Sequence, residues 1–161
     1  MTYQPRPGQY GTLKTGTFFG YFIELGTDCK DDHVVVYAGN GMVLEATPSK
    51  GIVLSPLARY DGCKIAWNRD VFTDEEGAAI VAEGMKHLKE GYSLLAIALI
   101  ALRILHVTND HFMSRYMKKS AKFICSGFAA HLWSEAIGRP ISDKPNWLTT
   151  PADLMYRNLY L

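Results

Sequence analysis

Hydrophobic and polar positions along the chain predict strands in its first half and helices after them. Residues 33–38, HVVVYA, are mostly β-branched or aromatic and suit a largely buried strand. Residues 39–41, GNG, accept the positive φ that a tight hairpin loop needs, and residues 42–46, MVLEA, form the return strand. A second turn at 47–51 leads to a third short strand at 52–54. The pattern therefore predicts a small antiparallel sheet.

The hairpin brings a histidine and a glutamate together. A three-residue loop at 39–41 places Ala38 opposite Met42. Counting along both strands then places His33 opposite Thr47. Glu45 becomes the diagonal neighbour of His33 on the same face, at roughly 7–8 Å between backbones, which is within reach of the two side chains. A slip of one residue would move Glu45 to the other face.

Two later segments have helical periodicity. Thr73 and Glu76 form a capping box, and an apolar stripe follows to an expected helix end at Gly91; it consists of Ile80, Val81, Gly84, Met85 and Leu88. A second stripe starts at Cys125 and continues through Phe128, Ala129, Leu132, Trp133, Ala136 and Ile137. Gly138 and Pro140 end that helix, so Cys125 lies in or near its first turn.

A thiol at a helix N-terminus has a chemical use. Unpaired amide groups and the positive end of the helix dipole favour the thiolate, which is the form that attacks carbonyl groups. The amides of Cys125 and Ser126 would point towards the oxyanion of a tetrahedral intermediate. A single Cys on an apolar stripe is more often a small core residue, and a His or Glu at a strand end is more often structural. The combination of all three, with nucleophile, base and acid on facing elements, favours catalysis.

These segments resemble a known family. Residues 33–41 with 44–46 resemble the His-bearing hairpin of NlpC/P60 cysteine peptidases, whose third polar catalytic residue lies twelve positions after the His, where this chain has Glu45. Residues 123–128, FICSGF, resemble the nucleophile segment of that superfamily. Cys125 follows His33 here, which is similar to the circularly permuted branch that includes YiiX/YaeF-like and lecithin:retinol acyltransferase-like proteins.

Further matches extend the resemblance over about residues 6 to 156. Residues 6–8, RPG, 91–92, GY, and 150–154, TPADL, are similar to segments of that branch. The chain departs from it at residues 8–10, GQY, where members usually have Gly-Asp-Ile, and at Gly127, where an acidic residue is frequent. Both departures concern substrate contacts rather than the three catalytic candidates.

The resemblance implies an α+β fold of the papain-like NlpC/P60 type, circularly permuted, with a small antiparallel sheet packed against helices. It implies a cysteine peptidase or amidase with Cys125 as nucleophile, His33 as general base and then acid, and Glu45 orienting the imidazole. The expected substrate is an amide in cell-wall (peptidoglycan) peptide or an N-acyl amide, and no cofactor is needed. Thr47, Tyr92 and Trp133 are the candidates for lining the substrate pocket. Two alternatives stay open: a lipid acyltransferase or phospholipase using the same three residues, and a non-catalytic binding module.

Length and composition fit one domain over residues 1–161. An apolar fraction of 48% with 20% charged residues is ordinary for a globular protein, and a net charge of +1 argues against a nucleic-acid binder. The N-terminus lacks the apolar core of a secretory signal, so we expect synthesis in the cytoplasm, with later delivery elsewhere left open. The odd count of three cysteines leaves a Cys29–Cys63 bridge open.

Two further segments carry hypotheses. Residues 94–107 are apolar on nearly every face but shorter than the roughly 20 residues that span a bilayer. They predict either a buried helix or an apolar lid that meets an acyl chain, a membrane or a second subunit. Basic residues at 115–122 are either a solvated connector or a source of positive potential beside Cys125. Residues 106–111 include two His and one Asp, but their spacing does not suit a metal site, and none is expected.

Overall fold

A computed structural model of the protein describes residues 3–16, 31–92 and 123–160. Its central hairpin consists of β2 (His33–Gly39) and β3 (Met42–Thr47). Val35 pairs with Glu45 and Tyr37 with Val43, which confirms the expected register in the middle of the hairpin. The expected pairing of Ala38 with Met42 is wrong, because a bulge next to the turn pairs Gly39 with Met42 instead.

The bulge follows from the backbone of the turn. Gly39, Asn40 and Gly41 all have positive φ, at 94°, 50° and 69°. Asn40 and Gly41 are therefore the two central residues of a tight turn, and Gly39 belongs to the strand. The extra residue is absorbed at Ala38, so the register beyond the bulge, where His33 and Glu45 lie, is unaffected.

Three more strands complete an antiparallel sheet with the order β4-β3-β2-β1-β5. β4 (Gly51–Pro56) is the expected third strand. β1 (Tyr10–Leu13) and β5 (Ile65–Trp67) were not expected from the sequence. A short 3-10 helix, η1 (Leu57–Tyr60), joins β4 to the chain that leads into β5.

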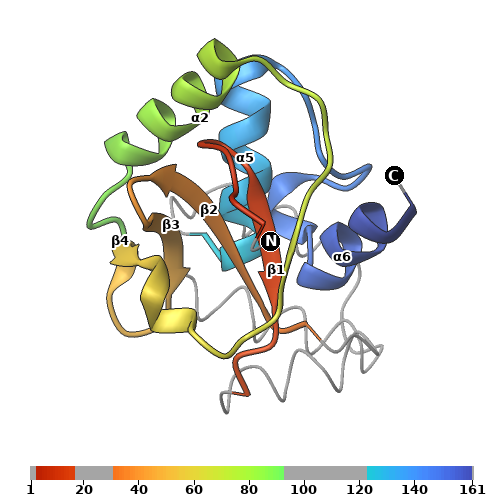
Figure 1. Cartoon of the computed structure of the whole chain (residues 1–161). Helices are drawn as coiled ribbons and strands as arrows, with labels where there is room; N and C mark the ends of the chain where they lie inside the picture. Colours follow the sequence, from red (N-terminus) through yellow and green to blue (C-terminus); the bar gives the residue numbers. More distant parts are fainter. Residues whose placement is uncertain (1–2, 17–30, 93–122, 161) are drawn as a thin grey trace, which may run out of the picture.

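Helices α2 (Asp74–Lys86) and α5 (Cys125–Ile137) pack side by side against one face of the sheet (Figure 1). Side chains along β2 and β3 alternate between the two faces of the sheet, and the helices cover the face that carries the larger apolar cluster. Val34, Val36 and Leu44 belong to the core that includes α5, whereas Val35 and Val43 belong to a smaller cluster on the opposite face. The protein is thus α+β, with a small antiparallel sheet packed against helices, as the sequence predicted.

Helix α2 begins as expected and ends earlier. The capping box at Thr73 and Glu76 is present in both directions. The helix stops at Lys86 rather than near Gly91, because the chain turns back to the sheet: the Lys89 amide donates to the Ile52 carbonyl, and the Ile52 amide donates to the Glu90 carbonyl. Of the expected stripe, Met85 is exposed rather than in the core.

Helix α5 matches the prediction at both ends. It starts at Cys125 and is followed by Gly138 in the left-handed conformation, with φ of 65°. After η2 (Asn146–Leu148), the chain ends in α6 (Pro151–Tyr160). The Asp153 carboxylate accepts hydrogen bonds from the amide and the hydroxyl of Thr150, which fixes the start of α6.

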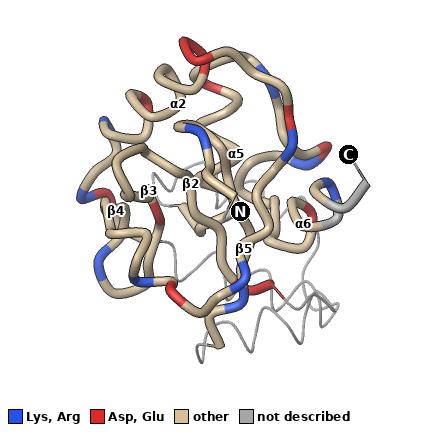
Figure 2. The backbone as a smooth tube through the Cα atoms, in the orientation of Figure 1, with Lys and Arg blue, Asp and Glu red and all other residues tan. Residues whose placement is uncertain are grey.

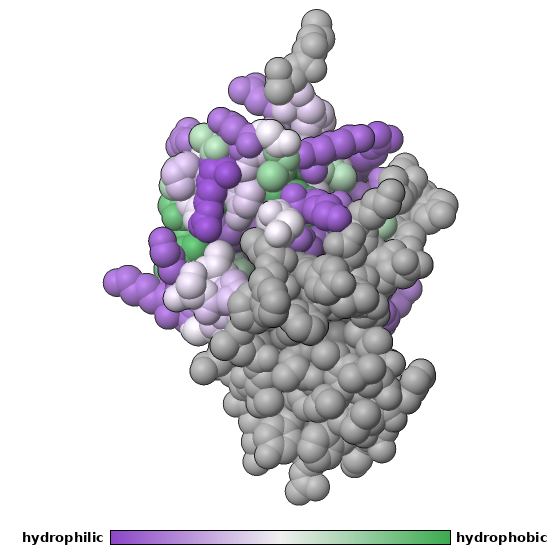
Figure 3. Space-filling view, turned by 90° about the horizontal axis from the view of Figure 1, so that it is seen from below, coloured by the Kyte–Doolittle hydropathy of each residue, from purple (hydrophilic) through white to green (hydrophobic). Residues whose placement is uncertain are grey.

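Charged residues of both signs are distributed over the described chain (Figure 2). Viewed from below, the described part of the surface is largely hydrophilic, with apolar residues between the charged ones (Figure 3). Within the described ranges, no helix is long and apolar enough to cross a membrane. The segments 94–107 and 115–122 lie outside the described residues.

Candidate active site

The structure brings the three catalytic candidates together from three elements. His33 opens β2, Glu45 lies on β3 and Cys125 is the first residue of α5. His33 Nε2 lies 2.8 Å from Glu45 Oε2. The Cys125 side chain lies near enough to the imidazole to raise the pKa of His33, and because Nε2 is engaged by Glu45, Nδ1 is the nitrogen left for the thiol. The imidazole therefore connects an acid to a thiol.

Glu45 is fully buried and well supplied with donors. The Tyr60 hydroxyl donates a hydrogen bond to Glu45 Oε2, and Arg59 Nη1 lies 3.4 Å from Oε1. The Ser55 side chain also contacts the carboxylate. Burial alone would raise the pKa of Glu45, but hydrogen bonds from His33, Ser55 and Tyr60 outweigh it and lower the pKa from 4.5 to about 2. Glu45 is thus a carboxylate at any physiological pH.

His33 is held as a cation by its two partners. Burial of the ring opposes protonation, but the hydrogen bonds and charges of Cys125 and Glu45 raise the pKa of His33 from 6.5 to about 10. Its side chain is 13% exposed, so little water competes with these contacts. A positively charged imidazole beside a cysteine is the arrangement that activates thiol nucleophiles in general.

The N-terminus of α5 places amide groups beside the sulfur. The Phe128 amide is the first to close a helical hydrogen bond, to the Ile124 carbonyl at 2.8 Å, so the amides of Cys125 and Ser126 precede the helical ladder. The Ser126 hydroxyl is engaged elsewhere, because it donates to the Thr149 carbonyl at 2.7 Å. Cys125 is 3% exposed, which fits both a core residue and a nucleophile that a substrate must reach.

The surroundings of Gly127 account for a glycine at the position where the branch that the sequence resembles often has an acidic residue. A Cβ at this position would lie 2.6 Å from the backbone oxygen of Asn146. The loop at η2 therefore occupies the space that an acidic side chain would need, and the described structure leaves no room for one.

A pocket of about 440 Å³ opens beside the histidine and glutamate. Its lining residues come from the segment after β1, the start of β2, β3 and the turn after it, and the segment around η1; they are Thr15, His33, Glu45, Thr47, Pro48, Ser49, Arg59, Tyr60 and Cys63. Thr47, a residue expected at the pocket from the sequence, is among them. The Arg59 side chain is 53% exposed and brings a positive charge to the pocket.

The other two pocket candidates lie elsewhere. Tyr92 packs against the core cluster that contains Cys125 and is not among the pocket residues; burial and the charge of Cys125 raise the pKa of its hydroxyl. Trp133 is fully buried; its ring contacts Tyr10 and Phe72, and its Nε1 donates to the Gly8 carbonyl at 3.0 Å. The structure places Trp133 in the core, where a helical residue eight positions after Cys125 packs against the sheet.

Sequence reasoning missed the residues that hold Glu45. Arg59 and Tyr60 lie in η1, directly after β4, and from there both side chains reach Glu45. No spacing in the sequence indicates this contact. Cys63 is a free cysteine in the structure, and Cys29, its partner in the expected bridge, lies outside the described residues.

Comparisons with known proteins support the fold. No protein-family model matches the sequence, and a search of curated proteins finds no relative. Among solved structures, the chain is similar to the crystal structure of the metalloprotein YiiX from Escherichia coli O157:H7, with a TM-score of 0.63 and 13% identity. The alignment covers 88% of this chain and 71% of YiiX. The two chains share a fold. The likeness agrees with the YiiX-like branch that the sequence motifs indicated, and at this identity it says nothing further about activity.

Proposed function

We propose that this protein is a cysteine hydrolase with a circularly permuted papain-like domain, in which Cys125, His33 and Glu45 act together. The observation that carries the proposal is the position of the His33 ring, which is hydrogen-bonded to a buried carboxylate and lies near enough to a cysteine at a helix N-terminus for that side chain to raise the pKa of the ring. A histidine with a purely structural role needs a hydrogen-bond partner, but it does not need a cysteine at a helix N-terminus beside it. Nucleophile, base and orienting acid are the arrangement that acyl transfer requires.

In the proposed mechanism, the Cys125 thiolate attacks the carbonyl carbon of an amide, and the oxyanion forms near the amides of Cys125 and Ser126. The His33 imidazolium gives its proton to the leaving nitrogen as the C–N bond breaks, which yields a thioester and a free amine. Neutral His33 then takes a proton from water, and the resulting hydroxide attacks the thioester. The acid is released, and Cys125 leaves as the thiolate while the proton stays on His33.

Glu45 has a positioning role in this scheme. Its carboxylate holds Nε2 of His33 at 2.8 Å and keeps the ring oriented while its charge alternates. Tyr60 and Arg59 in turn bind the same carboxylate and fix its position. The proposal therefore includes residues that act through Glu45 to determine the orientation of the base.

The pocket favours a polar amide substrate. Thr47, Ser49 and Arg59 line it, and the half-exposed guanidinium is suited to a substrate carboxylate, which peptide stems of the bacterial cell wall carry. A cell-wall peptide is thus the favoured substrate, and an N-acyl amide is the second. A lipid acyltransferase or phospholipase would use the same Cys, His and Glu on an ester.

The test is to trap the acyl-enzyme. The full chain is incubated separately with peptidoglycan fragments, N-acyl amides and phospholipid vesicles, and the intact mass is measured with and without Cys125→Ser. A mass increase on Cys125 with a peptide or acyl amide, together with amine release, supports the proposal. An adduct with phospholipid alone assigns the lipid alternative, and no adduct or release with any of them contradicts the hydrolase.

A further inference from the structure

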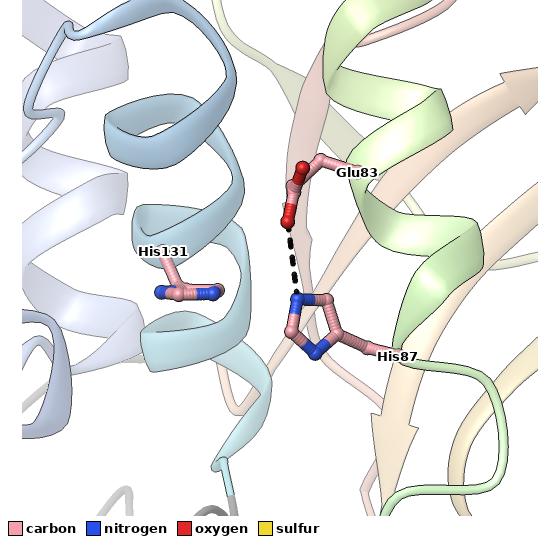
Figure 4. A group of neighbouring side chains, drawn as sticks. All are labelled: Glu83, His87 and His131. Atoms are coloured by element: carbon pink, nitrogen blue, oxygen red, sulfur yellow. Dashed lines mark ion pairs between the residues drawn. The ribbon is translucent and has the colours of Figure 1, made fainter.

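Three side chains outside the pocket converge between the two helices that cover the sheet. Glu83 and His87 are four residues apart, on α2 and directly after its last residue, and so lie on one side of it. His131 faces them from α5 (Figure 4). The carboxylate oxygen and ring nitrogens of the three residues all lie within 4.8 Å of one another. Sequence reasoning found no role for either histidine.

Carboxylate oxygens lie near both ring nitrogens of His87, but neither nitrogen makes a hydrogen bond within the described part of the chain. The His87 side chain is 17% exposed. Glu83 Oε1 lies 3.5 Å from Nε2, and Glu90 Oε1 lies 3.0 Å from Nδ1 without the alignment of a hydrogen bond. Buried ring nitrogens usually have a partner, because an unpaired buried polar group is costly.

Aromatic rings enclose the group on one side. Phe123 lies with its ring centroid 4.7 Å from that of His131 and 5.6 Å from that of His87, and the two imidazoles are 5.1 Å apart. An apolar wall of this kind lowers the local dielectric constant and strengthens the interaction of nearby ligands with a cation. Two imidazoles and a carboxylate that face one another are a set of donors that one metal ion can share.

We propose that Glu83, His87 and His131 form a transition-metal site that is suited to Zn²⁺. Two imidazoles and one carboxylate are a donor set that zinc accepts, with a fourth position left for water. Ligands of a tetrahedral zinc ion lie ~3.4 Å apart, given bond lengths near 2.0–2.1 Å. The Glu83 to His87 separation of 3.5 Å already meets this, and the full set within 4.8 Å needs only side-chain adjustment.

Neighbouring charges complete the site. Lys86 binds Glu83 through Oε2, which leaves Oε1 directed at His87. Glu90 lies beside Nδ1 of His87, on the ring edge opposite to Nε2. A carboxylate at the second nitrogen of a metal-bound histidine orients the ring and raises its basicity. Glu90 is therefore a positioning residue of the proposed site.

Such an ion would link α2 to α5, the helix that begins with Cys125. None of its three ligands lines the pocket, so the site is separate from the proposed catalysis. Its expected effect is to stabilise the packing of the two helices by binding only the folded chain.

The test uses the full chain carrying Cys125→Ser, so that the thiol beside His33 does not capture the metal. Zn²⁺ binding is measured by calorimetry on chelator-treated protein, together with the thermal midpoint and the absorption spectrum with Co²⁺. We expect one equivalent to bind, the midpoint to rise and the Co²⁺ spectrum to show nitrogen and oxygen ligands. His131→Asn and Glu83→Gln, each in this background, abolish all three effects.

Two further variants sharpen the result. Glu90→Gln weakens binding about 10–100-fold, as expected of a residue that supports a metal ligand. Glu75→Gln, an exposed glutamate at the other end of α2, binds like the parent. If His131→Asn does not fold by circular dichroism, Glu83→Gln decides alone. The proposal fails if the parent binds no Zn²⁺, or if Glu83→Gln binds it as tightly as the parent.

Discussion

Replacing Glu45 by glutamine isolates the charge at the centre of the site. The substitution Glu45→Gln keeps the shape of the side chain and removes its negative charge, while His33 and Tyr60 remain in place. Because the neutral amide resembles a protonated carboxyl group, the comparison between the two proteins measures what ionisation of this carboxyl contributes.

The magnitude follows from the pKa of Glu45, which the fold lowers from 4.5 to about 2. With a tenfold change in acidity worth about 1.4 kcal/mol, this corresponds to about 3 kcal/mol of folding free energy at neutral pH. Because the folded pKa is below the unfolded one, this stability is present above pH 4.5 and is lost as the pH falls towards 2. The variant should therefore be less stable than wild type by about 3 kcal/mol at neutral pH, and by progressively less below about pH 4.5.

Urea unfolding followed by tryptophan fluorescence, at several pH values from about 7 down to about 3, measures this difference. Equal slopes of the two transitions show that the midpoints report stability alone. The reasoning is refuted if the gap between the two proteins is the same at the acid end of this range as at neutral pH, because the effect would then arise from packing and not from charge.

Three other substitutions test the surroundings of the site. Tyr60→Phe removes the donor to the buried carboxylate and should cost about 2 kcal/mol in urea unfolding, as expected for a hydrogen bond to a charged group; an unchanged midpoint would show that the contact contributes nothing. Thr73→Ala removes the cap of α2 and should cost about 1 kcal/mol while thiol reactivity stays at the wild-type rate, and slower labelling would contradict the separation of cap and site. Gly127→Ala drives a methyl group to 2.6 Å from the Asn146 oxygen and should destabilise the fold by about 1–3 kcal/mol, whereas a neutral result would mean that the loop yields freely.

The sequence predicted correctly those parts of the fold that depend on contacts between residues close together in the chain. Hairpin register depends on turn residues and on alternation along two adjacent strands, so the facing of His33 and Glu45 could be predicted. The bulge at Ala38 could not, because residues 39–41 are compatible with both a three-residue and a two-residue loop. The start of α5 at Cys125 and its end before Gly138 followed from an apolar stripe and a helix breaker.

The elements and contacts that the sequence did not predict depend on residues that are far apart in the chain. β1 and β5 are short and have no strong alternation, and they become strands by pairing with β2 and with each other. Helix α2 ends at Lys86 because residues 89 and 90 bond to Ile52 across the fold, which no helix-ending signal encodes. The contact of Tyr60 with Glu45 is also not encoded by any local signal. Glu83, His87 and His131 come together only when α2 packs against α5.

The most direct test of the central claim is the rate at which iodoacetamide labels Cys125, measured across pH by peptide mass spectrometry in wild type, His33→Ala and Glu45→Ala. We predict fast labelling near neutral pH that is selective over Cys63 and that both substitutions slow. Labelling that is no faster than that of Cys63 and indifferent to His33 and Glu45 would contradict it, and the chain would then be a binding module that keeps the fold without the chemistry.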